Sequence, residues 1–272
     1  MSDPNVGGMG GLKGRVALVT GASGGLGYAS AKALARRGAR VAIASRGGAK
    51  LDAARERLVL EAPEGSEVVA IPADIRDLDA LVRLTGEVER RLGPVDILVA
   101  NGGGPPSKPA LDLTEEDWQI AIPLALLFVP RLCRLVLPAM RERAWGRIVA
   151  INSVSTKQPI PALALSNTLR PAVVGYLKTL SQEVAADGVT VNAVLPGYTL
   201  TERQEELASA ASARTGKSRE EVVAGWIGNT PIGRMAQPDE IGAMVGFLCS
   251  PEASYVTGQA IAVDGGYVKG LL

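Results

Sequence analysis

The chain has 272 residues, of which 47% are hydrophobic and 21% are charged, and its formal net charge is +1. This composition provides ample material for a core, gives no sign of disorder, and includes no basic run long enough to follow a nucleic acid backbone. The chain contains no histidine, which excludes Ser-His-Asp hydrolysis, histidine-ligated metals and imidazole acid–base catalysis. We therefore expect one globular domain that binds a small molecule, with no nucleic acid partner and no metal.

The N-terminus and the two cysteines indicate the compartment. The first residues, MSDPNVGGMGG, lack the charged and apolar regions of a signal peptide, and we expect residues 1–12 to form a flexible tail before a domain at 13–272. We find no stretch with the roughly 18 apolar residues of a membrane span. Cys133 and Cys249 lie in apolar stretches without disulfide or metal-site spacing, so we predict buried free thiols in a reducing compartment. These features predict a cytoplasmic protein with no membrane partner.

After the tail, apolar runs of strand length alternate with helix-like stretches. We predict strands at Val16–Val19, Val41–Ala44, Glu67–Ile71, Val95–Ala100, Arg147–Ile151, Val189–Leu195 and Ala260–Val263. We predict helices at Tyr28–Arg37, Lys50–Glu61, Asp77–Leu92, Glu115–Arg143, Pro171–Ala186 and Pro238–Leu248. Repeated β-α-β units with two-sided apolar strands predict a single-domain α/β fold, a Rossmann-type doubly wound parallel sheet of about seven strands covered by helices on both faces.

Two features interrupt this regular alternation. Residues Thr201–Gly233 contain two polar, helix-prone pieces, and two interpretations stay open for them: a surface excursion or a substrate lid. Proline is tolerated in the first turn of a helix but not in its interior. Because of Pro171, we expect the fifth helix to begin near Asn167 or Thr168, with Arg170 at its mouth.

The segment Arg15–Gly27, RVALVTGASGGLG, contains a strand-like run, a glycine-rich turn and the start of a helix. Gly21, Gly25 and Gly27 follow the pattern G-x-x-x-G-x-G. A Cβ on the first would hinder the turn, and one on the later pair would hold the backbone away from a pyrophosphate. The free N–H groups of the first helical turn then face the phosphates. This context predicts a dinucleotide-binding turn, whereas the glycines alone would be weak evidence, because most glycines simply make turns.

The end of the second predicted strand indicates which dinucleotide binds. An acidic residue at this place would accept hydrogen bonds from a free ribose 2′-OH. The chain instead has Ser45 and Arg46, followed by Lys50. A hydroxyl and a guanidinium suit a 2′-phosphate, which favours NADP over NAD. The alternative is that Arg46 only caps the loop, in which case either cofactor binds.

Several ordered motifs give the chain a resemblance to the short-chain dehydrogenase/reductase family over nearly its whole length, in particular to its 3-oxoacyl-acyl-carrier-protein reductase-like branch. TGASGGLG at Thr20–Gly27 matches the family's TGxxxGxG, Asp74 matches its adenine-contacting Asp, and Asn101 begins a segment near its NNAG. Further matches are Gly146-Arg147-Ile148-Val149, Pro196-Gly197, Ser254–Gly258 and Val263–Gly266. The resemblance implies cofactor contacts from Gly21, Ser23, Gly24, Gly25, Leu26, Gly27, Ser45, Arg46, Asp74, Ile75, Asn101, Gly102, Gly103, Arg170, Pro196, Gly197 and Thr199.

The catalytic residues of the family are only partly matched. In the family a Ser is followed 13 positions later by Tyr and 17 positions later by Lys, and an Asn lies in the long fourth helix. Ser153 matches the Ser, but the other places fall on Ser166, Arg170 and Ala125. A serine hydroxyl is far less acidic than a phenol, so Ser166 donates a hydrogen bond but is a poor proton donor. Arg170 can bind the nicotinamide ribose but stays protonated, so it cannot relay a proton.

Other titratable residues are weaker candidates. Lys157 and Tyr198 lie in predicted loops near the same strand ends and are the substitutes for the missing acid, although a loop lysine is usually solvated. Tyr28 and Lys32 satisfy Y-x-x-x-K, but they fall in the first helix beside the phosphates, and we assign them no catalytic role. The candidate catalytic set is therefore Ser153, Ser166, Arg170 and Lys157.

The resemblance implies an NADP-dependent oxidoreductase that acts on a carbonyl or alcohol substrate with an altered proton delivery. Use of the bound dinucleotide for epimerisation or elimination is a variant of this hypothesis. The replaced residues leave open a second class, a dinucleotide-binding sensor or scaffold without turnover. Family members usually pair their fourth and fifth helices, so we expect a homo-oligomer, a dimer or homotetramer, with Leu124–Leu137 at an interface. The sequence does not identify the substrate.

Overall fold

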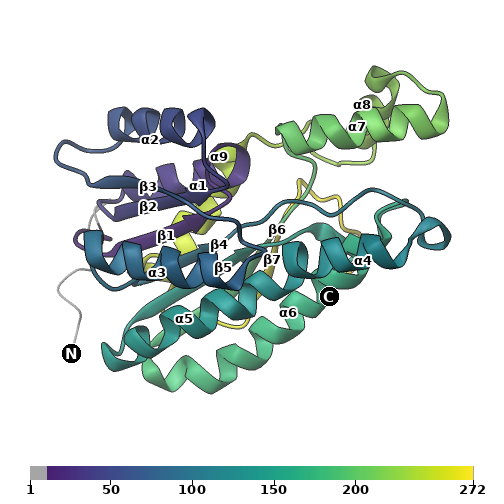
Figure 1. The fold of residues 1–272 in the computed structure, drawn as a ribbon. Helices are drawn as coiled ribbons and strands as arrows, with labels where there is room; N and C mark the ends of the chain where they lie inside the picture. Colours follow the sequence, from purple (N-terminus) through teal and green to yellow (C-terminus); the bar gives the residue numbers. More distant parts are fainter. Residues whose placement is uncertain (1–10, 272) are drawn as a thin grey trace.

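A computed structural model describes residues 11–271 and contains a seven-stranded parallel sheet in the order β3-β2-β1-β4-β5-β6-β7 (Figure 1). The residues of β1, β4, β5 and β6 are buried along their whole length, because helices cover both faces of the sheet. This confirms the predicted single-domain Rossmann-type fold. The strands are β1 (Val16–Thr20), β2 (Arg40–Ser45), β3 (Val68–Pro72), β4 (Ile97–Ala100), β5 (Gly146–Ile151), β6 (Val189–Pro196) and β7 (Ala260–Val263).

Helices form a layer on each side of the sheet. On one side α1 packs against α9 and α2, and their apolar residues share a core with Ala17 and Val19 of β1. On the other side α3, α5 and α6 pack over Leu18 of β1 and Leu98 of β4. The helices are α1 (Gly25–Ala35), α2 (Ala49–Glu61), α3 (Leu78–Leu92), α4 (Glu115–Ile122), α5 (Phe128–Glu142), α6 (Ala164–Val184), α7 (Glu202–Thr215), α8 (Arg219–Gly228) and α9 (Pro238–Leu248).

The start of the domain differs slightly from the expected one, and both cysteines are free. Residues 1–10 of the expected tail lie outside the described residues. Leu12, which we placed in that tail, is fully buried, and its N–H donates to the Arg37 carbonyl at 3.1 Å. The domain therefore begins by Leu12 rather than at residue 13. Cys133 and Cys249 are both buried and free, as predicted.

The long apolar segment forms a helix that is interrupted by a π turn at Pro123–Leu127, between α4 and α5. Pro123 has no N–H to give to the preceding turn, and an added residue accommodates it. An 18-residue window of Glu115–Glu142 has a mean hydropathy of 2.0, so this helix is long and apolar enough to cross a membrane, contrary to our expectation that no stretch is. In the structure 44% of this window is buried. The helix α5 nevertheless packs against β4 and β5, as a core helix does.

Helix α6 begins earlier than expected. It starts at Ala164 instead of near Asn167 or Thr168, and Pro171 lies in its interior. Leu165 and Leu169 are buried in an apolar cluster with residues of α4 and the π turn. Burial of these side chains outweighs the lost backbone hydrogen bond. Arg170 is consequently not at the mouth of the helix but within it, and only 6% of the residue is exposed.

The position of Pro171 predicts a stabilising substitution. Pro171→Ala restores an N–H to the interior of α6, and the gain in helix propensity of about 3 kcal/mol is offset by about 1 kcal/mol of unfolded-state entropy. The free energy of unfolding in urea should rise by roughly 1–2 kcal/mol. Pro238→Ala is the matched control, because Pro238 occupies the first turn of α9, where proline is tolerated, and should give no such gain. A midpoint for Pro171→Ala below that of Pro238→Ala would contradict the argument.

Candidate functional site

A cleft of about 1420 Å³ runs along the carboxyl ends of the central strands. Parallel pairing aligns these ends, since Thr20 of β1 pairs with Ala44 and Ala100 of β4 pairs with Ala150. The loops after β1, β2, β4, β5 and β6 therefore meet at one edge of the sheet and line the cleft. The strand order reverses between β1 and β4, and open α/β sheets bind ligands at such a switch point.

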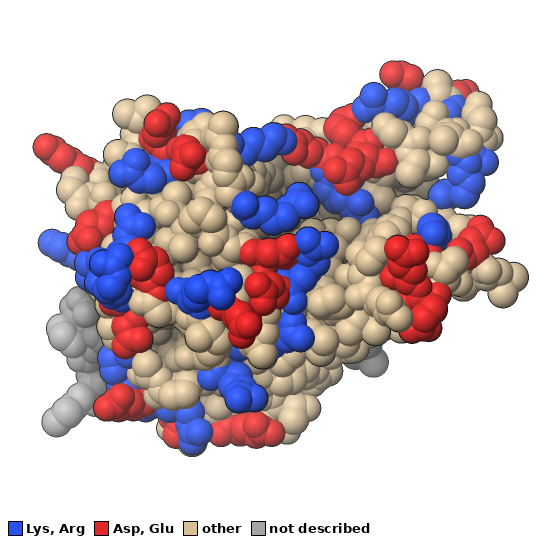
Figure 2. Space-filling view, in the orientation of Figure 1, with Lys and Arg blue, Asp and Glu red and all other residues tan. Residues whose placement is uncertain are grey.

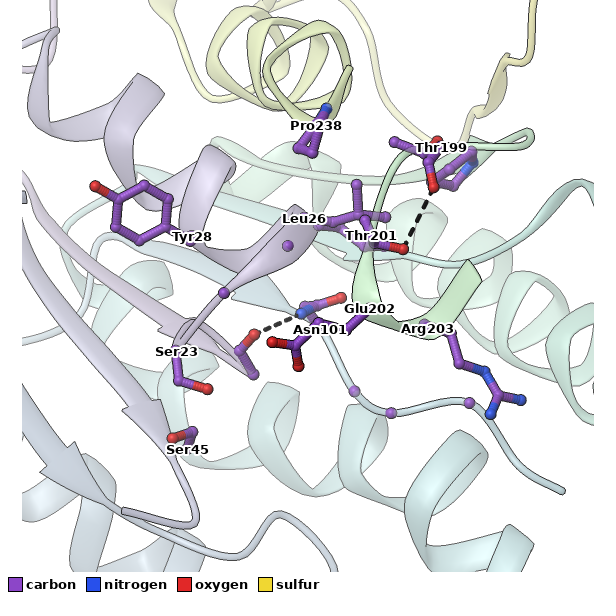
Figure 3. A pocket seen from close by; sticks show the side chains of 18 of the residues that line it. Ser23, Leu26, Tyr28, Ser45, Asn101, Thr199, Thr201, Glu202, Arg203 and Pro238 are labelled. Atoms are coloured by element: carbon purple, nitrogen blue, oxygen red, sulfur yellow. Dashed lines mark hydrogen bonds between the residues drawn. The ribbon is translucent and has the colours of Figure 1, made fainter. Parts of the chain in front are cut away.

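The turn after β1 forces a close approach between backbone segments. Gly21 has φ +59°, and a Cβ on Gly27 would overlap the Gly21 carbonyl oxygen. Asn101 fixes the turn from the neighbouring strand. Its Nδ2 donates to the Gly21 carbonyl at 3.1 Å (Figure 3), and its N–H donates to Thr20 Oγ1 at 3.0 Å. The first helical bond of α1 runs from the Tyr28 N–H to the Gly24 carbonyl. The N–H groups of the turn before it have no acceptor within the helix, as an anion-binding site requires.

One end of the cleft is basic. Figure 2 shows Lys and Arg side chains in the hollow between the α2 side of the molecule and the projecting α7–α8 segment. Arg76 pairs with Asp74 at 2.6 Å, and its hydrogen bonds lower the pKa of that carboxyl. Lys50 pairs with Glu202 at 3.0 Å. Arg46 lines this end and makes no ion pair within residues 11–271, although its charge contributes to the lowered pKa of Asp74. Its guanidinium can therefore pair with an anion.

Tyr28 also lines this end, but it is unsuited to proton transfer. Its hydroxyl donates to Glu61 at 2.7 Å, and burial, followed by this bond, raises the pKa of Tyr28 to about 12. Lys32 pairs with Asp239 at 2.6 Å. The Y-x-x-x-K pair in α1 is thus used in structural ion pairs and hydrogen bonds, in keeping with the absence of a catalytic assignment.

The other end of the cleft contains a group of serines. Ser153 follows β5, and its Oγ accepts from the Ser155 N–H at 3.1 Å. The hydroxyls of Ser155 and Ser166 lie 3.2 Å apart, so one donates to the other. Ser153 and Ser166 line the cleft as predicted. Ser155 was missed, because only the docking of α6 onto the loop after β5 brings it to Ser166.

Arg170 lies on the floor of the same end. Its Nη2 donates to the Gly103 carbonyl at 3.3 Å, whereas its Nε has no hydrogen-bond partner. Burial, and then the like charge of Arg203, lower the pKa of Arg170 to about 10, so the group stays protonated at neutral pH. Asn152 donates to the Arg170 carbonyl at 2.9 Å and holds this turn of α6 against β5.

The two substitute acids lie elsewhere. Lys157 is exposed and is not among the residues that line the cleft. Tyr198 stacks on Trp226 at 4.9 Å and contacts Tyr267 edge-on, and burial raises its pKa above the ordinary value. Neither residue lines the cleft with Ser153 and Ser166. Ala125, at the expected Asn place, is fully buried under Leu165 and Leu169.

The interrupting segment, residues 201–233, forms α7 and α8, which project from the sheet (Figure 1). The start of α7 lines the cleft through Thr201, Glu202 and Arg203, and the Arg203 side chain points away from Ser23 and Ser45 (Figure 3). Arg203 Nη2 donates to the Pro105 carbonyl at 2.6 Å, which connects this segment to the loop after β4. Sequence reasoning missed Arg203, because no motif marks it.

The predicted cofactor residues converge on this cleft. With one exception they all line it; Gly27 lies behind the lining, where it allows α1 to approach β1. Of the predicted catalytic residues, Lys157 alone lies outside the lining. The structure thus brings together a glycine turn, an unpaired guanidinium and a pair of serines along one groove.

Comparison with known proteins agrees with this geometry. A family model described as enoyl-(acyl carrier protein) reductase matches residues 21–268. The 3-oxoacyl-[acyl-carrier-protein] reductase of Synechocystis sp. is 35% identical over 259 residues, which cover 94% of this chain and 98% of the relative. A crystallised variant of the actinorhodin polyketide ketoreductase with NADPH is 36% identical, with a TM-score of 0.90 over 94% of this chain and 98% of that one.

A further solved structure is similar to this chain in sequence and fold. It is an NADPH-bound short-chain oxidoreductase from Pseudomonas aeruginosa PAO1 that contains an atypical catalytic center. It is 31% identical, with a TM-score of 0.86, and covers 95% of this chain and 98% of its own. From the extent of these matches, together with the glycine turn and the order of the strands, the chain belongs to the short-chain dehydrogenase/reductase family.

Proposed function

We propose that the protein is an NADP-dependent oxidoreductase that reduces a small carbonyl compound with an altered proton delivery. The observation that carries this proposal is that the glycine turn, Arg46, Ser153 and Ser166 all line one cleft. The similarity to reductases crystallised with NADPH supports the same cofactor here.

The residues present fit this dinucleotide. The overlap that a Cβ on Gly27 would cause explains why a glycine stands there, and the same approach exposes the N–H groups of Gly25 and Leu26 to a pyrophosphate. Arg46 can pair with a 2′-phosphate, and Ser45 can donate to it. Asp74 and Ile75 would hold the adenine, and Asn101, Gly102 and Pro196 would hold the nicotinamide end.

When bound, the reduced dinucleotide supplies a hydride to the carbonyl carbon. The chain then has to stabilise the negative charge that develops on the carbonyl oxygen. Ser153 and Ser166 donate hydrogen bonds, and Arg170 contributes a fixed positive charge in a site where burial reduces screening. The proton itself comes from solvent water, since neither serine is acidic enough to supply it at neutral pH. The expected rate is lower than with a phenolic acid by about 10²–10⁴-fold.

A dinucleotide-binding sensor or scaffold is the second candidate. It is favoured by the lack of any phenol or amine at the positions of Ser166 and Arg170, while the cofactor end is intact. Turnover separates the two candidates. If the protein binds NADPH tightly and no carbonyl compound supports NADPH oxidation, it is a sensor or scaffold.

The cofactor assignment predicts that NADP(H) binds more tightly than NAD(H). Arg46→Ala removes charge-assisted hydrogen bonds to the 2′-phosphate, so NADPH affinity should fall by roughly 10- to 100-fold while NADH affinity changes little. Calorimetry measures both. Arg83→Ala is the control, because Arg83 is an exposed residue of α3 that does not line the cleft. Equal affinities of the wild type for both cofactors, or tighter NADH, would refute the assignment.

The catalytic assignment predicts weak or absent NADPH oxidation with simple ketones. Ser166→Tyr with Arg170→Lys restores the family's acid and should raise the rate, by up to roughly 10²–10⁴-fold if Pro171 lets the phenol reach the substrate oxygen. Ala125→Asn would complete the set, but it places an amide in an apolar cluster, so the double variant is measured first. A wild type that already oxidises NADPH with simple ketones at ordinary family rates would contradict the assignment.

The face formed by α5 and α6 predicts a homo-oligomer, a dimer or tetramer that includes Leu124–Leu137. A shallow groove there is lined by Pro130, Pro138 and Tyr176, and more than half of the apolar window remains unburied in the single chain. Light scattering at micromolar concentration should give a multiple of the chain mass. Tyr176→Glu should shift the protein toward monomer, whereas Leu60→Glu on the exposed face of α2 should not. A monomeric wild type would remove the idea.

A further inference from the structure

The charge of Arg170 is not balanced by the protein. Four carboxylates line the cleft among residues 11–271, and each has a basic partner: Arg76 on Asp74, Lys50 on Glu202, Arg203 on Glu206 and Lys32 on Asp239. None of them pairs with Arg170. With 6% of the residue exposed and its Nε unpartnered, the guanidinium is both desolvated and uncompensated. A buried charge of this kind is costly unless a ligand pairs with it.

A second guanidinium lies close to the first. Arg170 Nη2 donates to the Gly103 carbonyl and Arg203 Nη2 donates to the Pro105 carbonyl, at 3.3 and 2.6 Å. These two carbonyls are two residues apart, which is about 7 Å of extended chain at most. A Cβ on Gly104, between them, would lie 2.5 Å from Arg203 Nε. The loop therefore fixes both guanidiniums at the same end of the cleft, one from the floor and one from the start of α7.

The nicotinamide ribose does not remove the need for an anion. Its hydroxyls can accept hydrogen bonds from Arg170, but they are neutral and leave the positive charge in place. Ser153, Ser166 and Arg170 all line the cleft, and the two hydroxyls are further hydrogen-bond donors. The donor set of two guanidiniums and two hydroxyls matches a carboxylate next to a carbonyl oxygen.

We propose that the substrate is a short oxo acid whose free carboxylate binds between Arg170 and Arg203. This inference rests on the proposed reductase function and names its substrate class. The carboxylate compensates Arg170, and Arg203 draws the start of α7 onto the bound acid. Glu206, which holds Arg203 Nη1 at 3.1 Å, releases part of that guanidinium on binding. Neutral esters and thioesters of the same acid lack the group that the site selects.

Binding is measured without turnover by calorimetry, in a buffer free of other carboxylates and of phosphate. The probes are 3-oxobutanoate and 2-oxobutanoate, each against its methyl ester, and the N-acetylcysteamine thioester of 3-oxobutanoate. Each is titrated into the free protein and into the protein with NADP⁺, which cannot donate a hydride. We expect at least one acid to bind at least about 10-fold more tightly than its ester in both states. Acids and esters that bind alike once NADP⁺ is present would overturn the inference, because the ribose would then satisfy Arg170.

Variants test which guanidiniums are responsible. Arg170→Gln should abolish the preference for the acid, Arg170→Lys should retain part of it, and Arg203→Gln should reduce it. Arg83→Gln removes the same charge from α3, outside the cleft, and should leave the preference unchanged. Arg170→Gln removes an uncompensated buried charge, so its thermal midpoint should not fall. If Arg170→Gln does not fold, the test uses Arg203→Gln, because Arg203 is partly exposed. An unchanged preference for the acid in Arg203→Gln would contradict the two-guanidinium site.

Activity separates this inference from the function it rests on. NADPH oxidation that is equal for acid and methyl ester would refute the substrate class and leave the reductase function in place. Acid-selective binding with no NADPH oxidation would support the carboxylate site and refute the reductase function. Turnover confined to the acid supports both.

Discussion

The close approach of α1 to the end of β1 is the constraint on which the site depends. Gly27 has no Cβ, so the helix can rest against the Gly21 carbonyl, and Asn101 and Thr20 connect the same turn to the end of β4 by three hydrogen bonds. This contact fixes the N-terminus of α1 at the switch point of the sheet. It also determines where the loop after β4 begins, and therefore where Gly103 and Pro105 stand to receive the two arginines. A larger residue at position 27 would move the whole edge of the cleft.

Most of the fold could be predicted from the sequence. The strand runs are apolar on both faces because helices cover both sides, and this pattern alone predicted the seven strands within two residues at each end. The start of α6 was wrong because a local rule was applied to Pro171 without its surroundings. Leu165 and Leu169 gain more from burial against Ala121 and Ala125 than the helix loses at the proline. Such a balance depends on contacts between segments about 40 residues apart, which no local pattern contains.

The residues of the site likewise fall into those that could be predicted from the sequence and those that could not. Residues tied to the backbone of a strand end, such as Gly21, Arg46 and Ser153, could be placed from the sequence, because parallel strands deliver their carboxyl ends to one edge. Ser155 and Arg203 could not. Ser155 is defined by its contact with a hydroxyl of α6, and Arg203 by the reach of a segment that interrupts the β-α alternation. Lys157 was a reasonable guess from sequence distance to Ser153, but the loop turns it toward solvent.

Ser166 and Arg170, at the places of the family's Tyr and Lys, change the kind of chemistry in the site and not only its rate. In the family, the positive charge of the amine lowers the pKa of the phenol, so the phenol can donate a proton near neutral pH. Here Ser166 is too weak an acid and Arg170, even with its pKa near 10, too strong a base to lose a proton at neutral pH. What remains is a fixed charge beside a hydroxyl in a poorly solvated pocket. A fixed charge cannot deliver a proton, but it stabilises an anion whenever one is present, in the substrate or in the developing oxygen. Ser166 thus replaces the general acid with a hydroxyl that cannot supply the proton, while Arg170 keeps a permanent positive charge at the place of the family's amine. Recognition of the substrate and stabilisation of the reaction then become functions of one guanidinium.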